Sequence, residues 1–147
     1  LHWGTEYRSD PDPAQEDVAA RLAAVPEVDL VIGHHAHVVQ PVQRVGETWV
    51  VFGLGNQISN QSDAPRRDGL TIVATVGGPP GGPLDVVGLE AVPTWVDLPV
   101  HRVVPVAETL ADPGLDPARR AELEASLART MEVVNRRGAG IEIAAWS

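Results

Sequence analysis

The apolar segment Val28–Ile32 constrains the fold more than any other stretch of this chain. It is too apolar to alternate between core and solvent, which is typical of a strand in a sheet covered on both faces. A helix is predicted before it, because Asp12 is a suitable N-cap, Pro13 fits the first helical position and Gln15 completes a capping box. A helix that leads into a buried strand indicates an α/β (α+β) fold, in which ligands gather beyond the carboxyl ends of the strands.

The remainder of the chain is predicted to be rich in strands and to end in a helix. The expected strands cover residues 42–45, 49–52, 70–76 and 84–92, and a broken run covers 95–106. The final helix is expected from about Pro117 to Arg136, with Asp116 as its N-cap and its end near Gly138. Its predicted apolar stripe consists of Leu123, Leu127, Met131 and Val134. Residues 110–116 are the best candidate for a linker.

Composition excludes several classes of function. The chain has no cysteine, so disulfides and thiolate metal sites are excluded and any metal must be held by nitrogen and oxygen ligands. It carries 11 arginines and no lysine against 20 acidic residues, and the net charge of −9 argues against nucleic acid as a partner. No apolar run reaches the roughly 18 residues that a transmembrane segment needs. The chain opens at Leu1, not at Met, and we expect it to be the back part of a longer protein.

Three histidines directly follow the predicted buried strand, in the sequence Gly33-His34-His35-Ala36-His37. Imidazole is the commonest neutral metal ligand near physiological pH. In extended backbone His35 and His37 project to the same side and His34 points away, so His35 and His37 are the predicted ligands. They are expected to serve either one ion or one ion each in a pair.

Two further segments carry candidate site residues. In His2-Trp3-Gly4-Thr5-Glu6-Tyr7, His2 is a candidate ligand, and Glu6 is a candidate to orient a ligand, contact substrate or act as an acid or base. Alone, this segment reads better as a partly buried histidine beside a packed tryptophan. In Gly53-Leu54-Gly55-Asn56, the glycines predict a turn in which Asn56 tolerates left-handed backbone.

Taken together, the order and spacing of these motifs resemble the CapA family of capsule synthesis proteins. That family is involved in poly-γ-glutamate synthesis and belongs to the calcineurin-like metallophosphoesterase superfamily. The resemblance is close from Leu1 to about Gln61 and loose up to Val106. It implies the C-terminal half of a β-sandwich flanked by helices over residues 1–106, followed by a linker and helical extension over 107–147.

The resemblance also implies roles for individual residues. His2 and His35 would ligate one metal ion and His37 the neighbouring one, while Glu6 and Asn56 lie in family-typical motifs and are the candidate catalytic residues. The full-length domain would hold two divalent ions, with Mn, Fe and Zn not distinguishable. The superfamily's Asp-x-His, Gly-Asp and Asn-His motifs, which supply the bridging carboxylate, are absent from this chain. The missing N-terminal half of the same domain is therefore an expected partner, and the chain alone is expected to be inert.

Three functions remain open at this point. The favoured one is a metal-dependent hydrolase whose site is incomplete here, acting on a phosphoester or an anionic polymer. The alternative is a non-catalytic capsule-binding or polymer-binding accessory domain with at most one bound metal. A mononuclear zinc hydrolase using His2, His35 and His37 is geometrically possible. The family resemblance leans towards a location at the cell envelope.

Overall fold

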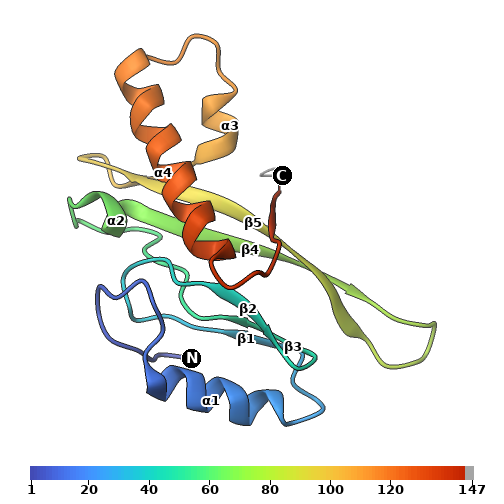
Figure 1. Ribbon diagram of the computed structural model, residues 1–147. Coiled ribbons are helices and arrows are strands. Elements are labelled where there is room, and N and C mark those ends of the chain that lie inside the picture. Colours follow the sequence, from blue (N-terminus) through green and yellow to red (C-terminus); the bar gives the residue numbers. More distant parts are fainter. Residues whose placement is uncertain (145–147) are drawn as a thin grey trace.

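The computed structural model describes residues 1–144, so the end of the predicted C-terminal extension, residues 145–147, lies outside the described residues. Helices and two mixed sheets make up the molecule, which confirms the α/β class (Figure 1). The elements in chain order are α1 (Pro13–Ala23), β1 (Leu30–Ile32), β2 (Val42–Val45), β3 (Thr48–Val51), α2 (Ala64–Arg67), β4 (Asp68–Gly77), β5 (Asp85–Asp97), β6 (Arg102–Pro105), α3 (Val106–Leu110), α4 (Pro117–Asn135) and β7 (Glu142–Ile143).

The first sheet has the strand order β1-β3-β2, with β1 parallel and β2 antiparallel to β3. The predicted buried strand is β1, and the two faces of this sheet pack against different partners. Val31 and Val50 pack with Ala19 of α1 in one apolar cluster, whereas Leu30 packs against the larger cluster shared with the second sheet. The sheet is therefore covered on both faces, and within β1 only Ile32, at the strand end, is exposed.

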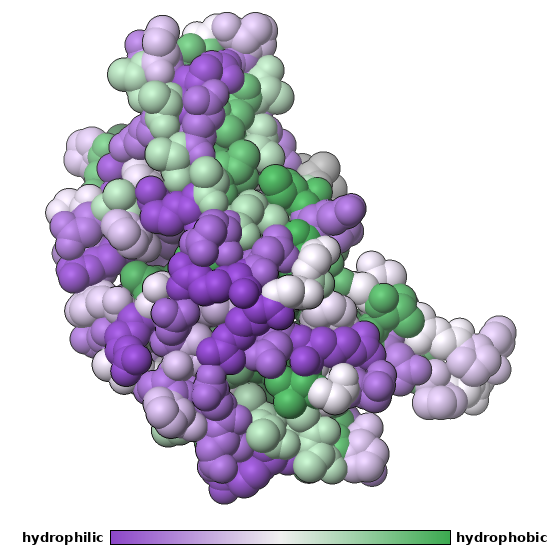
Figure 2. Space-filling model, viewed as in Figure 1, coloured by the Kyte–Doolittle hydropathy of each residue, from purple (hydrophilic) through white to green (hydrophobic). Residues whose placement is uncertain are grey.

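The second sheet has the order β4-β5-β6, and the short strand β7 pairs in parallel with β5. Strands β4 and β5 form a long antiparallel hairpin that projects from the body of the molecule (Figures 1 and 2). The predicted break in β5 near Pro93 is wrong, because the strand continues to Asp97. Pro93 pairs with Leu70, whose N–H donates to Leu54 on the opposite edge, so the missing N–H of Pro93 interrupts no bond to β4.

The caps of the two long helices agree with the sequence predictions. Asp12 and Gln15 form the reciprocal capping box at the start of α1, and Asp116 accepts a hydrogen bond from the backbone N–H of Arg119 in α4. The stripe predicted for α4 is only partly right. Its buried residues are Leu123, Ser126, Thr130, Val133 and Val134, while Leu127 and Met131 are half-buried.

Helix α4 lies across β4 and β5 and joins the two halves of the core (Figure 1). Its N-terminal half packs with α3 around the buried Trp95 of β5. Its C-terminal half contributes Val133 and Val134 to the cluster that also contains Val42 of the first sheet and Leu70 of the second. Within residues 1–144, none of the helices is both long enough and apolar enough to cross a membrane.

Candidate metal centre

The N-terminal segment lies beside the end of β1 and runs parallel to it. The Leu1 amino group donates to the Ile32 carbonyl at 2.6 Å, the His34 N–H donates to the Leu1 carbonyl at 2.8 Å, and the Trp3 N–H donates to the His34 carbonyl at 3.1 Å. This pairing places His2 beside the histidine loop. As a result the rings of His2 and His35 lie with their centroids 4.2 Å apart, at an angle of 44°.

Trp3 anchors the segment that carries His2. Its indole Nε1 donates to the Phe52 carbonyl at 2.8 Å, and its ring stacks on the Phe52 ring at 5.7 Å between centroids. This contact requires a glycine at position 33, because a Cβ there would lie 2.0 Å from Trp3 Nε1 and 2.1 Å from the Phe52 carbonyl oxygen. The tryptophan is packed as expected, whereas His2 itself is exposed.

The backbone of the histidine loop is not extended, contrary to the sequence prediction. The φ angles of His35 and His37 are +102° and +57°, in the region that non-glycine residues rarely adopt. Two bonds hold the loop in this shape: the Tyr7 N–H donates to the Ala36 carbonyl at 2.7 Å, and the Asn56 amide donates to the His37 carbonyl at 3.2 Å. The turn leaves the rings of His35 and His37 6.4 Å apart.

Asn56 determines which nitrogen of His37 is available to a ligand. The Nδ2 of Asn56 donates to the carbonyls of His37 and Arg66, so its Oδ1 faces His37 Nδ1 at 2.8 Å. An amide oxygen can only accept, and Nδ1 must therefore carry the proton. The hydrogen-bond network thus assigns the lone pair of His37 to Nε2, as in metal sites where the other ring nitrogen is held by a neighbouring group.

Glu6 and Tyr7 lie beside His37. The Oε1 of Glu6 is 3.9 Å from His37 Nε2, and both side chains are partly exposed. The Tyr7 ring is stacked on the His37 ring with centroids 6.1 Å apart. The guanidinium of Arg66 lies over the Tyr7 ring at 3.8 Å, so a cation stands close to the histidine loop in a strongly acidic chain.

A buried pair of glutamines supports these loops, and sequence reasoning did not identify it as a pair. Gln15 Nε2 donates to Gln40 Oε1 at 2.9 Å, and Gln40 Nε2 donates to the Arg8 carbonyl at 2.9 Å. The pair lies against glycines, since a Cβ at Gly4 or Gly53 would approach it within 3 Å. Gln15 was predicted only as part of the helix cap, and no local signal marks Gln40.

His34 is not one of the predicted metal ligands. The residue is exposed, yet partial desolvation of its ring lowers its pKa below the usual value, with smaller contributions from the charged amino terminus and from His2. Its backbone, in contrast, bonds on both sides to the N-terminal segment. The role of His34 in the structure is to hold His2 in place.

The donor set fits a divalent metal centre in its chemistry. His2 and His35 lie together, His37 lies next to them with Nε2 unprotonated, and Glu6 adds a carboxylate. Neutral imidazoles with a carboxylate suit Mn, Fe and Zn. Among residues 1–144, no three histidine, aspartate or glutamate side chains converge closely enough to hold an ion as they stand.

Comparisons with known proteins concern the segment that carries this site. Residues 1–61 match the model of a family described as bacterial capsule synthesis protein PGA_cap. Over 71 residues the chain is 34% identical to the PGA biosynthesis protein CapA of Bacillus subtilis (strain 168) and 31% identical to the capsule biosynthesis protein CapA of Bacillus anthracis. No solved structure matches this chain at a significant level.

These matches cover 48% of this chain but only 18% and 17% of the lengths of the two relatives. The family match over residues 1–61 includes all five predicted site residues, which are His2, Glu6, His35, His37 and Asn56. The predicted resemblance is confirmed: residues 1–61 match the family of bacterial capsule synthesis proteins, and the chain is similar over 71 residues to two CapA proteins.

Proposed function

We propose that residues 1–61 supply part of a divalent-metal centre that hydrolyses an ester or phosphoester bond in a capsule-associated protein. The observation that carries this proposal is the approach of the His2 and His35 rings to 4.2 Å, from segments far apart in the chain. The ring of His37 lies next to them, and because its Nδ1 is bonded to Asn56, its Nε2 is left to bind a ligand. Paired ligands with a third beside them suit one ion held by His2 and His35, and a second held by His37.

Each residue has a defined task in this proposal. Asn56 fixes the ring of His37 because its Oδ1 accepts a hydrogen bond from His37 Nδ1–H, which keeps Nε2 directed away from Asn56. Glu6 lies 3.9 Å from that nitrogen, where a carboxylate can accept a proton from an attacking water. A bound divalent ion would lower the pKa of such a water and neutralise charge that develops at the attacked centre.

The charges imply that further ligands come from elsewhere in the protein. Three neutral imidazoles and one carboxylate do not balance two dications, and a bridging oxygen is required to keep two ions a few ångströms apart. Because the chain covers only 18% of its Bacillus subtilis relative, such ligands have room in the rest of the parent. We expect this chain alone to be inactive.

The substrate class follows from the family and the local charge. The names of the relatives connect them with capsule and PGA biosynthesis, which supports an anionic polymer or a phosphoester as substrate and a location at the cell envelope. The chain has a net charge of −9, so an anion must be attracted locally. Arg66, which lies over the Tyr7 ring and pairs with Asp63 at 3.2 Å, is one cation on this side of the histidine loop.

The decisive experiment measures metal content and hydrolysis in the full-length parent. We expect two Mn²⁺ ions per chain and turnover of p-nitrophenyl phosphate. His35→Ala and His37→Ala should each lower the metal content and abolish turnover, while His101→Ala, a histidine outside the site, should change neither. One ion or none, without turnover, would instead support the non-catalytic accessory domain.

A second experiment tests the positioning role of Asn56. Asn56→Ala should weaken Mn²⁺ binding by about 10- to 100-fold, because His37 loses the group that orients it. Asn60→Ala, a change at an exposed asparagine, is the matched control. If Asn56 contacted substrate instead, the variant would raise KM at unchanged metal affinity, and the positioning role would be wrong.

A further inference from the structure

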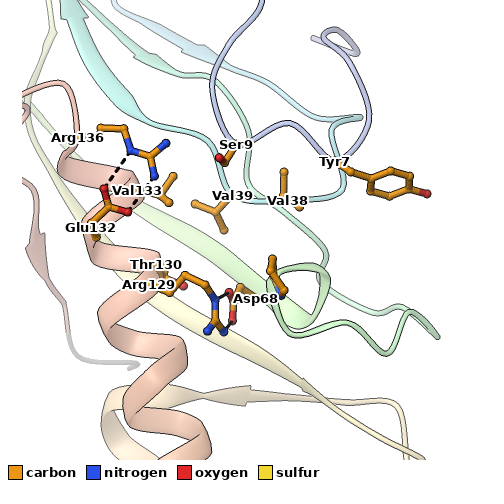
Figure 3. Close-up of a pocket in the computed structure, with 11 residues that line it drawn as sticks. Tyr7, Ser9, Val38, Val39, Asp68, Arg129, Thr130, Glu132, Val133 and Arg136 are labelled. Carbon is orange, nitrogen blue, oxygen red and sulfur yellow. Dashed lines mark hydrogen bonds and ion pairs between the residues drawn. The ribbon is translucent and has the colours of Figure 1, made fainter.

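A pocket of about 310 Å³ lies between α4 and the loop that follows the histidine cluster. Figure 3 shows Val38 and Val39 on the loop, Thr130 and Val133 on α4, and the Asp68–Arg129 pair at one edge. Most of the surface that lines this pocket is apolar. We call it the α4 pocket.

The charged groups of the α4 pocket already have partners. Arg129 donates to both carboxylate oxygens of Asp68 at 2.6 and 2.8 Å, and Arg136 donates to both oxygens of Glu132 at 3.0 and 2.9 Å. An ionic ligand would have to break one of these pairs, which is costly where Asp68 is buried. The pocket therefore suits an uncharged group.

One polar atom in the α4 pocket has no partner. The residue Thr130 is only 1% exposed, and its Oγ1 is buried without a hydrogen bond. Buried hydroxyl groups in proteins are almost always bonded. This oxygen lies beneath the pocket surface, so a ligand that offers a donor or an acceptor reaches it when the Thr130 side chain rotates toward the pocket. Together with the apolar walls, it suits an apolar group that carries one hydroxyl or ester oxygen.

The α4 pocket lies next to the loop that carries the candidate metal centre. Val38, which lines the pocket, directly follows His37, and Tyr7 both lines the pocket and stacks against the His37 ring. A molecule held at His37 therefore lies one residue along the chain from the pocket wall at Val38. We propose that the α4 pocket binds the uncharged organic group of the ester or phosphoester that the metal centre acts on. This inference rests on the proposed function.

The experiment uses benzyl alcohol, an apolar group with a single hydroxyl, as the probe. Amide NMR signals of the ¹⁵N-labelled chain are followed during titration. We expect saturable shifts at Tyr7, Val38 and Val133. Thr130→Val, which keeps the shape and removes the hydroxyl, should weaken binding about three- to tenfold, as the loss of one neutral hydrogen bond requires. Ser9→Trp, which fills the pocket from its rim, should abolish the shifts.

A matched control tests whether the alcohol binds in the α4 pocket and not elsewhere on the surface. Thr75→Val makes the same chemical change at an exposed position on β4 and should leave binding unchanged. Shifts confined to the projecting β4–β5 hairpin, or persisting unchanged in Ser9→Trp or Thr130→Val, would overturn the proposal. The spectra of the unliganded variants show whether each has folded.

The same samples distinguish failure of the pocket from failure of the metal centre. Mn²⁺ broadens the signals of residues close to it, so binding at His2 and His35 is read independently of the alcohol. Broadening at these histidines without alcohol shifts would overturn the pocket and leave the metal centre intact. Alcohol shifts in this chain, combined with no bound metal in the full-length parent, would overturn the metal centre and with it the assignment of the pocket to its substrate.

Discussion

Residues 1–61 and residues 62–144 differ in what they contribute to the molecule. The first region carries all the candidate site residues, on loops whose backbone is strained: Tyr7, His35 and His37 have positive φ angles. The second region lies outside the family match, yet it contains the long hairpin β4–β5 and the helix α4. Strained loops persist only where their surroundings hold them. The first region holds its own loops through Tyr7 and Asn56, and the second region adds outer contacts through Arg66 and Arg136.

The two regions share one apolar cluster, and arginines at the end of α4 add polar contacts between them. Arg136 donates to Asp10 at 2.8 Å, and Arg137 donates to Glu16 at 2.7 Å and to Gln43 at 2.9 Å. Asp10 and Glu16 flank the capped start of α1, which in turn follows the segment with His2 and Glu6. We infer that the two regions unfold together.

The largest effect is expected at Asp68, the buried carboxylate of the second region. Asp68→Ala leaves Arg129 and Ser126 without their acceptor, and we expect a loss of about 3 kcal/mol in the free energy of unfolding in urea. Asp63→Ala breaks an exposed pair with Arg66 and should cost under about 1 kcal/mol. If the amide of Trp3 stayed protected from hydrogen exchange while β4 lost protection, the regions would be independent.

The next effect is expected at Gly33 in the first region. Gly33→Ala places a methyl group against the Trp3 indole and the Phe52 carbonyl, and should cost about 2–3 kcal/mol. Gly88→Ala is the control, because a Cβ there would have no neighbour closer than 4.0 Å. Equal stability of the two variants in urea would show that the contact between the N-terminal segment and β3 is not tight.

A smaller effect is expected at the cap of α1. Asp12→Ala removes the acceptor for the Gln15 N–H and the Thr5 hydroxyl, and should cost about 1 kcal/mol. These two hydrogen bonds lower the pKa of Asp12, so the carboxylate stabilises the fold above the ordinary aspartate range and this contribution is lost as the pH falls through the lowered pKa. Asp12→Asn keeps a cap that does not titrate.

The measurement for this cap is the stability difference between wild type and Asp12→Asn as a function of pH. The wild type should lose its advantage in stability as the pH falls below about 4, and Asp12→Asn should then become the more stable protein. A difference that stays constant down to about pH 2 would contradict the assigned hydrogen bonds.

The smallest effect is expected at the link between the two regions. Arg137→Gln should cost under about 1 kcal/mol, because both Arg137 and Glu16 are partly exposed to water. A double-mutant cycle with Glu16→Gln isolates the ion pair from the contact of Arg137 with the Phe52 ring. A coupling energy of zero would show that the Arg137–Glu16 ion pair does not help to hold the two regions together.

Local patterns predicted much of the fold. The capping residues of α1 and α4 and the strands β2, β3 and β4 lie close to where the sequence places them, because caps, turns and apolar runs act over a few residues. The predictions fail where distant contacts decide. Pro93 continues a strand only because its missing N–H faces away from β4, and the buried face of α4 includes Thr130 because the helix contacts both parts of the core.

For the candidate site, the sequence predicted which residues take part but not how they are held. His2, His35 and His37 follow from the motifs, whereas the positive φ angles of the loop, the tautomer of His37 and the Gln15–Gln40 pair depend on hydrogen bonds between distant residues. The α4 pocket likewise has no sequence signal, since it combines Tyr7, the loop after His37 and one face of α4.

The amino-acid sequence alone determined the class of the fold, the family that residues 1–61 resemble and the identity of the candidate ligands. These properties follow from residue type and short-range spacing, on which strands, caps and motifs depend. Only the tertiary structure decided that His2 meets His35, that Asn56 bonds to Nδ1 of His37, and that α4 contacts the loop before α1. The reason is physical: each of these depends on which distant groups the folded backbone brings within hydrogen-bonding or packing distance.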